Sequence, residues 1–257
     1  MFRPCIDLHD GKVKQIVGGT LGDSGLKTNF VSDRPATWYA ELYRRDNLRG
    51  GHIIMLGPGN SIAAKQALEK FPGGMQVGGG INADEAGLWI DAGASHVIVT
   101  SWIFREGRLD RARLAELVER VGKSRVVIDL SCRKRGDDYV VMMDRSQTYT
   151  DLIVNAETLR ELSKSCAEFL VHAVDVEGLC RGIDGALVEK LGQWSSIPVT
   201  YAGGANSLAD LEETTRLGRG RIDLTIGSAL DIFGGSGVKY VDVVAFNKRQ
   251  RATSSKP

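Results

Sequence analysis

The sequence has 257 residues, enough for one large α/β domain or two small ones. Its 33 Lys and Arg residues nearly match its 32 Asp and Glu residues, and a net charge of +1 gives no support for a nucleic-acid or acidic-membrane partner. It contains no run of 18 apolar residues and no signal-peptide pattern, which predicts a soluble protein. Its four cysteines lack metal-site spacing, so we expect reduced intracellular thiols and no metal.

Short apolar runs alternate with segments of helical period along the whole chain, which is typical of βα units around a parallel sheet. The number of predicted strands is eight, the number in a closed βα barrel. The predicted strands are residues 3–8, 52–56, 75–78, 96–100, 125–130, 169–174, 198–202 and 222–226. The predicted helices are residues 36–46, 62–71, 83–93, 109–122, 156–167, 186–194, 208–218 and 240–250.

Local signals refine this outline. Asn82 and Ser207 precede two predicted helices and begin patterns typical of capping boxes. Two connections are long, residues 16–34 and 131–155, and loops of this length in a compact domain are often lids or binding loops. Both loops follow predicted strands that carry an aspartate.

The two halves of the sequence repeat each other. Ile6-Asp7-Leu8 recurs as Ile128-Asp129-Leu130, an offset of 129 minus 7, or 122. Three further matches follow in the same order at similar offsets: residues 52–55 with 172–175, 79–82 with 203–206, and 99–101 with 226–228. We therefore predict a (β/α)8 TIM barrel built from two repeated half-barrels, as one domain over residues 1–248. The polar residues 249–257 are expected to form a disordered tail.

Asp7 and Asp129 are the leading catalytic candidates. They lie near the ends of the first and fifth predicted strands, so they should face each other across the mouth of the barrel, where TIM-barrel active sites lie. One such aspartate could simply be a solvated strand end. Two related by the repeat favour an acid/base pair, and partial burial would raise their pKa values toward 7.

Two glycine clusters predict anion sites. The segments QVGGGIN and YAGGANS each run from a strand directly into a helix start, where free N–H groups and the helix dipole favour an anion. Ser101 and Ser228 end the next strand of each half with a hydroxyl donor. One cluster alone could be a tight turn. The duplicated pair indicates a ligand with a phosphate at each end.

The histidines are weaker candidates. His52 and His172 have strand parity opposite to Met55 and Asp175. If Met55 and Asp175 face the barrel interior, the histidines face the helices, and we expect them to be core residues.

Three residues beside the predicted site remain open. Trp102 follows a strand end and could stack on a ligand, although packing explains it equally well. Arg133 and Lys134 lie in the loop after Asp129, where either could help to hold an anion or belong to a solvated turn.

Several segments together resemble the histidine-biosynthesis isomerases of the HisA type, in their eukaryotic form: PCIDLHDGKVKQIVGG, QVGGGIN, VIVTSW, VVIDLSCRK, HAVDVEGLCRGID, VTYAGGA and GSALDIFGG. The resemblance spans Arg3 to about Asn247. It implies an Amadori rearrangement of the formimino-linked aminoimidazole carboxamide ribonucleotide (ProFAR), a small molecule with two phosphates, from its phosphoribosyl to its phosphoribulosyl form. It also implies Asp7 as general base, Asp129 as general acid, and no cofactor.

The substrate contacts expected on this basis are Gly19, Gly79, Gly80, Thr100, Ser101, Arg133, Asp175, Gly178, Gly203, Gly204, Gly227 and Ser228. The chain departs from the bacterial pattern, which usually has an aspartate where this chain has Met55 and a threonine where it has Ala173. Asp175 is expected to take over part of that role.

Two other functions fit part of the pattern. A HisF-like cyclase shares the repeat and both aspartates but requires ammonia and a docked glutaminase, and a non-catalytic barrel could merely bind phosphorylated metabolites. The VGGTLGDSG loop, the SALDIFGG segment and the retention of both aspartates favour the isomerase. Internal symmetry makes a monomer sufficient. The expected location is the cytoplasm, or the plastid stroma if a transit peptide has been removed.

Overall fold

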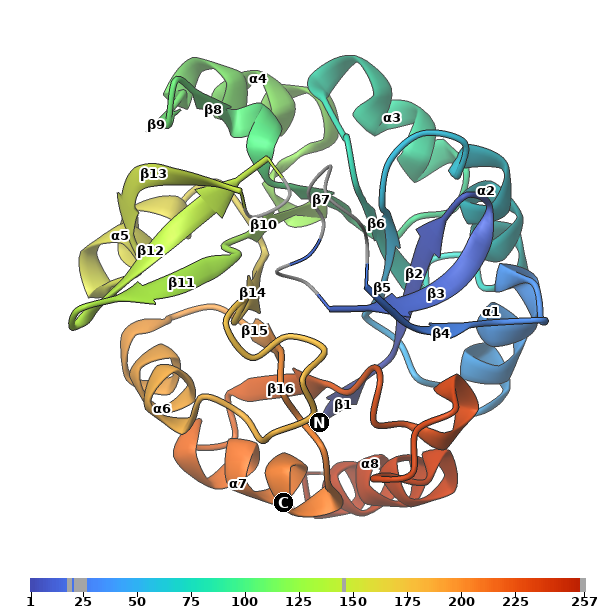
Figure 1. Ribbon diagram of the computed structural model, residues 1–257. Coiled ribbons are helices and arrows are strands. Elements are labelled where there is room, and N and C mark those ends of the chain that lie inside the picture. Colours follow the sequence, from blue (N-terminus) through green and yellow to red (C-terminus); the bar gives the residue numbers. More distant parts are fainter. Residues whose placement is uncertain (18–19, 21–26, 145–146, 255–257) are drawn as a thin grey trace.

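The computed structural model describes residues 1–17, 20, 27–144 and 147–254. Strands form a ring, and helices lie around its outside (Figure 1). The ring strands are β1 (Phe2–Arg3), β2 (Cys5–His9), β5 (Gly51–Met55), β6 (Met75–Gly78), β7 (Val97–Val99), β10 (Val126–Asp129), β14 (Glu168–His172), β15 (Val199–Ala202) and β16 (Ile222–Thr225). The α-helices are α1 (Ala36–Arg45), α2 (Ser61–Lys70), α3 (Ala83–Asp91), α4 (Arg111–Val121), α5 (Ala156–Leu162), α6 (Gly185–Trp194), α7 (Leu208–Leu217) and α8 (Tyr240–Ser254).

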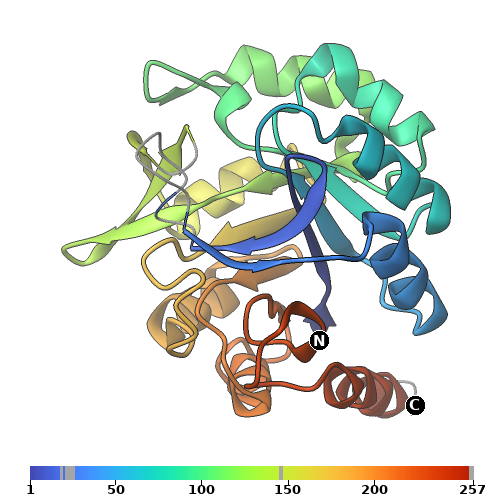
Figure 2. The ribbon, with the colours of Figure 1, turned by 45° about the vertical axis from the view of Figure 1, so that its right-hand side comes forward.

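The ring is closed by its first strand, which Pro4 divides into β1 and β2. β1 pairs in parallel with β16, and β2 pairs in parallel with β5 on the other side. The remaining ring neighbours are parallel as well, so the predicted (β/α)8 barrel is confirmed. Helix α8 lies against β1 in both views (Figure 1, Figure 2). There the Asn247 side chain accepts a hydrogen bond from Phe2 N and donates one to Phe2 O, both at 2.8 Å.

The predicted strands and helices all overlap observed ones, and the differences lie at their ends. Helix α5 ends at Leu162 rather than residue 167, and the Ser163 hydroxyl donates to the Arg160 carbonyl at 2.8 Å. Helix α8 runs to Ser254, so residues 249–254, which we expected to be disordered, belong to the last helix. The capping box at Ser207 is confirmed, and the Asn82 side chain accepts from Glu85 N at 3.0 Å. No helix in the described ranges is long and apolar enough to cross a membrane.

The two long connections contain antiparallel strands that the sequence did not predict. After β2, the chain forms β3 (Lys12–Ile16) and β4 (Thr28–Val31). After β10 it forms a separate sheet of β11 (Cys132–Arg135), β12 (Asp138–Met143) and β13 (Thr148–Ile153), and a small hairpin of β8 (Phe104–Arg105) and β9 (Arg108–Leu109) follows β7. The β3–β4 pair and the β11–β13 sheet stand on opposite sides of the ring (Figure 1).

The inside of the barrel is filled in layers. Ile98, Val127 and Leu170 form a buried apolar layer, against which Ile54 packs. Toward the amino ends of the strands lies a buried polar layer in which Glu168 accepts hydrogen bonds from Gln76 at 2.7 Å and Thr200 at 2.6 Å. The barrel is therefore packed below its mouth, and ligand space remains only at the carboxyl ends of the strands.

Candidate active site

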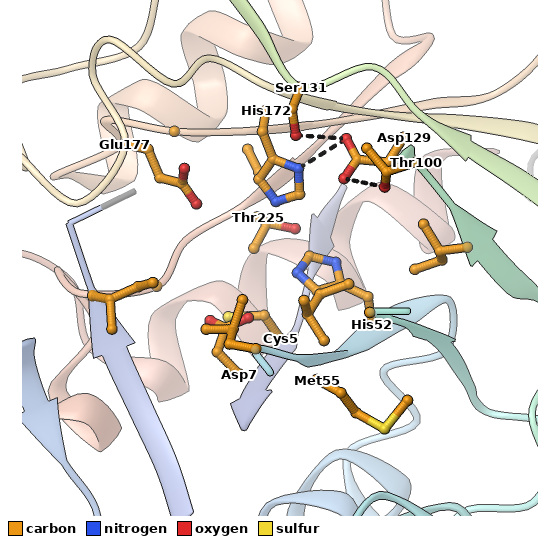
Figure 3. A pocket seen from close by; sticks show the side chains of 18 of the residues that line it. Cys5, Asp7, His52, Met55, Thr100, Asp129, Ser131, His172, Glu177 and Thr225 are labelled. Carbon is orange, nitrogen blue, oxygen red and sulfur yellow. Dashed lines mark hydrogen bonds and ion pairs between the residues drawn. The ribbon is translucent and has the colours of Figure 1, made fainter. Parts of the chain in front are cut away.

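The carboxyl ends of the ring strands surround a cavity of about 710 Å³. This volume lies within the range of small-molecule sites, roughly 300–1,000 Å³. Asp7 of β2 and Asp129 of β10 both line the cavity and lie on opposite sides of it (Figure 3). The barrel therefore brings both aspartates to one cavity, as the sequence predicted.

The Asp7 carboxylate accepts a hydrogen bond from Gln15 Nε2 at 3.0 Å, and Gln15 comes from the added strand β3. The side chain of Cys5 also hydrogen-bonds to it. Burial, followed by the negative charge of Glu177, raises the pKa of Asp7 to about 7, although His172 and the Gln15 hydrogen bond act in the opposite direction. A carboxyl group with this pKa can both take and give a proton at neutral pH.

Asp129 is buried and receives three hydrogen bonds. The Ser131 hydroxyl and His172 Nδ1 approach its Oδ1 at 3.0 Å and 3.2 Å, and the Thr100 hydroxyl approaches its Oδ2 at 3.4 Å. Hydrogen-bonding partners therefore face both oxygens of this carboxylate.

His172 and His52 both line the cavity, so the prediction that they face the helices is wrong. Their rings meet edge to face with centroids 6.0 Å apart. The error came from the assumption that Met55 and Asp175 face the barrel interior. Ile54 and Leu170 pack in the inner layer instead, so with a period of two His52 and His172 face inward on the same strands.

The two imidazoles differ in charge. Burial alone would lower the pKa of His172, but the charge and hydrogen bond of Asp129, followed by the charges of Glu177 and Asp7, raise it to about 9. Burial and the neighbouring charge of His172 lower the pKa of His52 to about 3. At neutral pH His172 is an imidazolium and His52 is a neutral ring. Burial also raises the pKa of Glu177.

The loop after β14 differs from expectation. The Asp175 carboxylate accepts from Lys134 N at 2.9 Å and lies 4.0 Å from Arg133 Nε, and none of these three residues lines the cavity. Glu177, two residues further on, lines it instead. The inward-facing residue at the end of β14 is His172, not Ala173, because Ala173 packs in the core outside the ring.

The two glycine clusters have the backbone geometry of anion cradles. Gly79 and Gly203 have φ angles of 95° and 129°, which non-glycine residues rarely adopt. A Cβ atom at Gly79 would lie 2.1 Å from the Met55 carbonyl oxygen, and one at Gly203 would lie 2.9 Å from that of Ala173. Each cluster leads into a capped helix start, α3 and α7 respectively.

The two serines are held in matching ways by the added loops. Ser101 Oγ accepts from Asp144 N at 2.9 Å, and Ser228 Oγ accepts from Asn29 Nδ2 at 3.1 Å. Because each hydroxyl accepts in these contacts, its own proton is free to be donated to a ligand oxygen. The two halves of the barrel therefore resemble each other in the orientation of the Ser101 and Ser228 hydroxyls as well as in their backbone.

The other expected contacts divide into two groups. Gly19 lies outside the described residues. Those that line the cavity are Thr100, Gly80, Gly178, Gly204 and Gly227. Sequence reasoning set His52 and His172 aside as core residues. It did not single out other polar lining residues near the aspartates, among them Cys5, Gln15, Ser131, Glu177 and Thr225. Period-two counting from Asp7 could have found Cys5, but no local pattern marks Gln15 or Glu177, which come from added loops.

The fold and the site together define a TIM barrel with two carboxylates and two glycine-rich helix starts at its mouth. The chain matches the histidine biosynthesis protein family over residues 1–250, and it belongs to this family. A Neurospora crassa relative is 54% identical, with 97% of this chain and 99% of the relative covered. A Saccharomyces cerevisiae relative is 51% identical, with coverage of 97% and 98%. A Medicago truncatula relative, described as chloroplastic, is 52% identical, with coverage of 98% and 83%. All three are named 1-(5-phosphoribosyl)-5-((5-phosphoribosylamino)methylideneamino) imidazole-4-carboxamide isomerases.

Proposed function

We propose that this chain is the histidine-biosynthesis isomerase that converts ProFAR from its phosphoribosyl to its phosphoribulosyl form. The observation that carries the proposal is the placement of Asp7 and Asp129 on opposite sides of one cavity, between two duplicated anion cradles. A ligand with a phosphate at each end would hold its central sugar between the two carboxylates. The names and high identities of the relatives support the same substrate.

The reaction begins on the Asp129 side, where a proton is delivered to the ring oxygen of the ribose as its bond to C1 breaks. The amine electron pair forms the C=N bond, which gives a protonated imine. Asp7 then removes the proton from C2 to form an enolamine. Transfer of that proton to C1, with loss of the C2 hydroxyl proton, gives the ketose.

The environment of Asp7 supports its role as the base. A general base works best when its pKa is close to the working pH, and the pKa of Asp7 is about 7. The proposal also includes a monomer, because both aspartates and both cradles come from one chain.

The test is to replace each aspartate by asparagine and measure ProFAR turnover and product binding. Asp7→Asn and Asp129→Asn should each lower kcat by about 10³-fold or more, because each removes a carboxylate on which proton transfer to or from the sugar depends. Affinity for the ligand should stay within about tenfold, because the cradles are intact. Near-normal turnover in either variant would contradict these roles.

The same assay separates the isomerase from the HisF-like cyclase. Purified protein should convert ProFAR in buffer that contains neither ammonia nor glutamine. If ProFAR is not converted but its phosphoribulosyl form is consumed once ammonia is added, the protein is a cyclase. If ligand binds and neither condition gives product, the barrel is a binding protein.

A further inference from the structure

We propose that His172, with Asp129 as its anionic partner, carries the proton that opens the sugar ring. The inference deepens the proposed isomerase function and depends on it. Asp129 orients the His172 ring and stabilises its positive charge, and His172 is the group that contacts the substrate oxygen.

The contacts of Asp129 argue against a proton on this carboxyl group. A carboxylic acid that protonates a substrate needs one oxygen that carries the proton and points at the substrate. Both oxygens of Asp129 instead receive donors, Oδ1 from Ser131 and His172 and Oδ2 from Thr100. The Ser131 and Thr100 hydroxyls can accept as well as donate, but the Nδ1–H of an imidazolium can only donate, so Oδ1 is held as its acceptor.

His172 is placed to act in its stead. Its Nδ1 is bound to Asp129, and no described residue hydrogen-bonds its other ring nitrogen, Nε2. Figure 3 shows Nε2 pointing into the pocket, on the side of Thr225 and Asp7. This is the arrangement of an imidazole that one carboxylate orients while the opposite nitrogen carries out proton transfer.

The charges around the ring keep it protonated at neutral pH. The negative groups that act on it are Asp129 of β10, Asp7 of β2 and Glu177 of the loop after β14. The basic group that faces it is His52 of β5, which is a neutral ring at this pH and does not repel it. Cys5 of β2 is a buried thiol whose pKa burial raises well above its usual value, so it adds no charge.

The proton transfers balance over the cycle. The Nε2 proton passes to the ring oxygen as the C1–O bond breaks, which leaves a neutral imidazole beside the ionised Asp129. Asp7 takes the C2 proton and later returns it to C1. The C2 hydroxyl proton released on ketone formation restores the imidazolium. The substrate isomerises without any net gain of protons or electrons.

The two halves of the barrel differ at this position. The counterpart of His172 is Ile54 by the pairing with β6 and β15 and Leu56 by the pairing with the aspartate strands, so by either register no imidazole stands in the equivalent place beside Asp7. The half that contains Asp129 therefore supplies the imidazolium. This asymmetry gives the direction of proton transfer that the sequence repeat left open.

The decisive variant is His172→Asn. An asparagine amide can occupy the place of Nδ1 and keep a donor on Asp129, but it has no proton to transfer. We expect kcat to fall by about 10²-fold or more while KM stays within about threefold, and the alkaline decline of kcat to disappear. If His172 only positions Asp129, His172→Asn will keep near-normal kcat, and the proposal is overturned.

A matched control is His96→Asn, which changes a histidine outside the cavity that contacts Ser95. It should turn over ProFAR like the unmodified enzyme. Failure of both the control and the unmodified enzyme to convert ProFAR would refute the isomerase function itself, whereas loss in His172→Asn alone supports the present inference.

A second measurement does not depend on the variant folding. Nitrogen-15 NMR of histidine side chains in the unmodified protein should show one imidazolium that persists to about pH 9 and shifts to lower pH in Asp129→Asn. If every histidine of the native protein is neutral by pH 7, His172 cannot be the acid.

Discussion

The two halves of this barrel share a backbone plan but differ in electrostatics. Asp7 is hydrogen-bonded by Gln15 and Cys5 and sits in the cavity near Glu177, whereas Asp129 has three donors, one of which is the His172 imidazolium. Part of the difference arises because His172 stands beside Asp129 and has no histidine counterpart beside Asp7 in either strand register. A fold can therefore repeat its geometry and still give its two aspartates opposite tasks.

The largest expected contrast is in stability. Asp129→Asn should lower the free energy of unfolding by about 3 kcal/mol at pH 8, because it leaves the His172 imidazolium without its closest anion. Asp7→Asn should raise it by about 2 kcal/mol at the same pH, because it removes a buried carboxylate that ionises with difficulty. Urea unfolding of both variants measures the difference.

The pH dependence of the Asp7 effect follows from the raised pKa. The pKa of Asp7 in the folded protein, about 7, exceeds the ordinary value of 3.8. Its contribution to stability is therefore complete below about pH 4 and lost as the pH rises to 7. The advantage of Asp7→Asn should accordingly vanish near pH 4; an advantage that is independent of pH would show that it has another origin.

The next contrast is between the two cradles. Gly79→Ala should cost about 3 kcal/mol and Gly203→Ala about 1–2 kcal/mol, because the added Cβ lies closer to a carbonyl oxygen at Gly79. Gly80→Ala is the matched control, since its φ is 76° but its Cβ would meet no atom within 4 Å. Thermal unfolding should show the largest loss of stability in Gly79→Ala, a smaller loss in Gly203→Ala and the smallest loss in Gly80→Ala. Equal losses in all three would assign the cost to φ alone.

The smallest expected effect concerns Gln15. Gln15→Leu removes the donor that lowers the pKa of Asp7, so this pKa should rise further and the acidic limb of the kcat/KM profile should move to higher pH. Activity at pH 6.5 should fall by less than about tenfold, with little change at pH 9. An unmoved acidic limb would show that Asp7 does not determine it.

The ring could be predicted from sequence because its signals are local and repeated. Apolar runs mark the strands, and helical periods with caps at Asn82 and Ser207 mark the segments between them. The aspartates and glycine clusters follow from the same repeat, since each lies at a strand end where the barrel gathers side chains.

The parts that could not be predicted depend on register or on long loops. The position of His172 relative to Asp129 is set by which residues pair across neighbouring strands. The assumption that Met55 and Asp175 face inward placed His172 on the wrong side of its strand. Gln15 and Glu177 reach the site from loops whose path is fixed only by tertiary contacts. Asp175, expected in the pocket, turns instead toward Lys134 N.

The divided first strand also has a consequence for folding during synthesis. β1 gains its partners only when β16 and Asn247 of α8 have been made, more than 200 residues later in the chain. Until then the nascent chain holds an open sheet with unpaired edges, and long-range closure of this kind is slow. Fragments that end before α8 should therefore aggregate, because an exposed strand edge pairs with other chains.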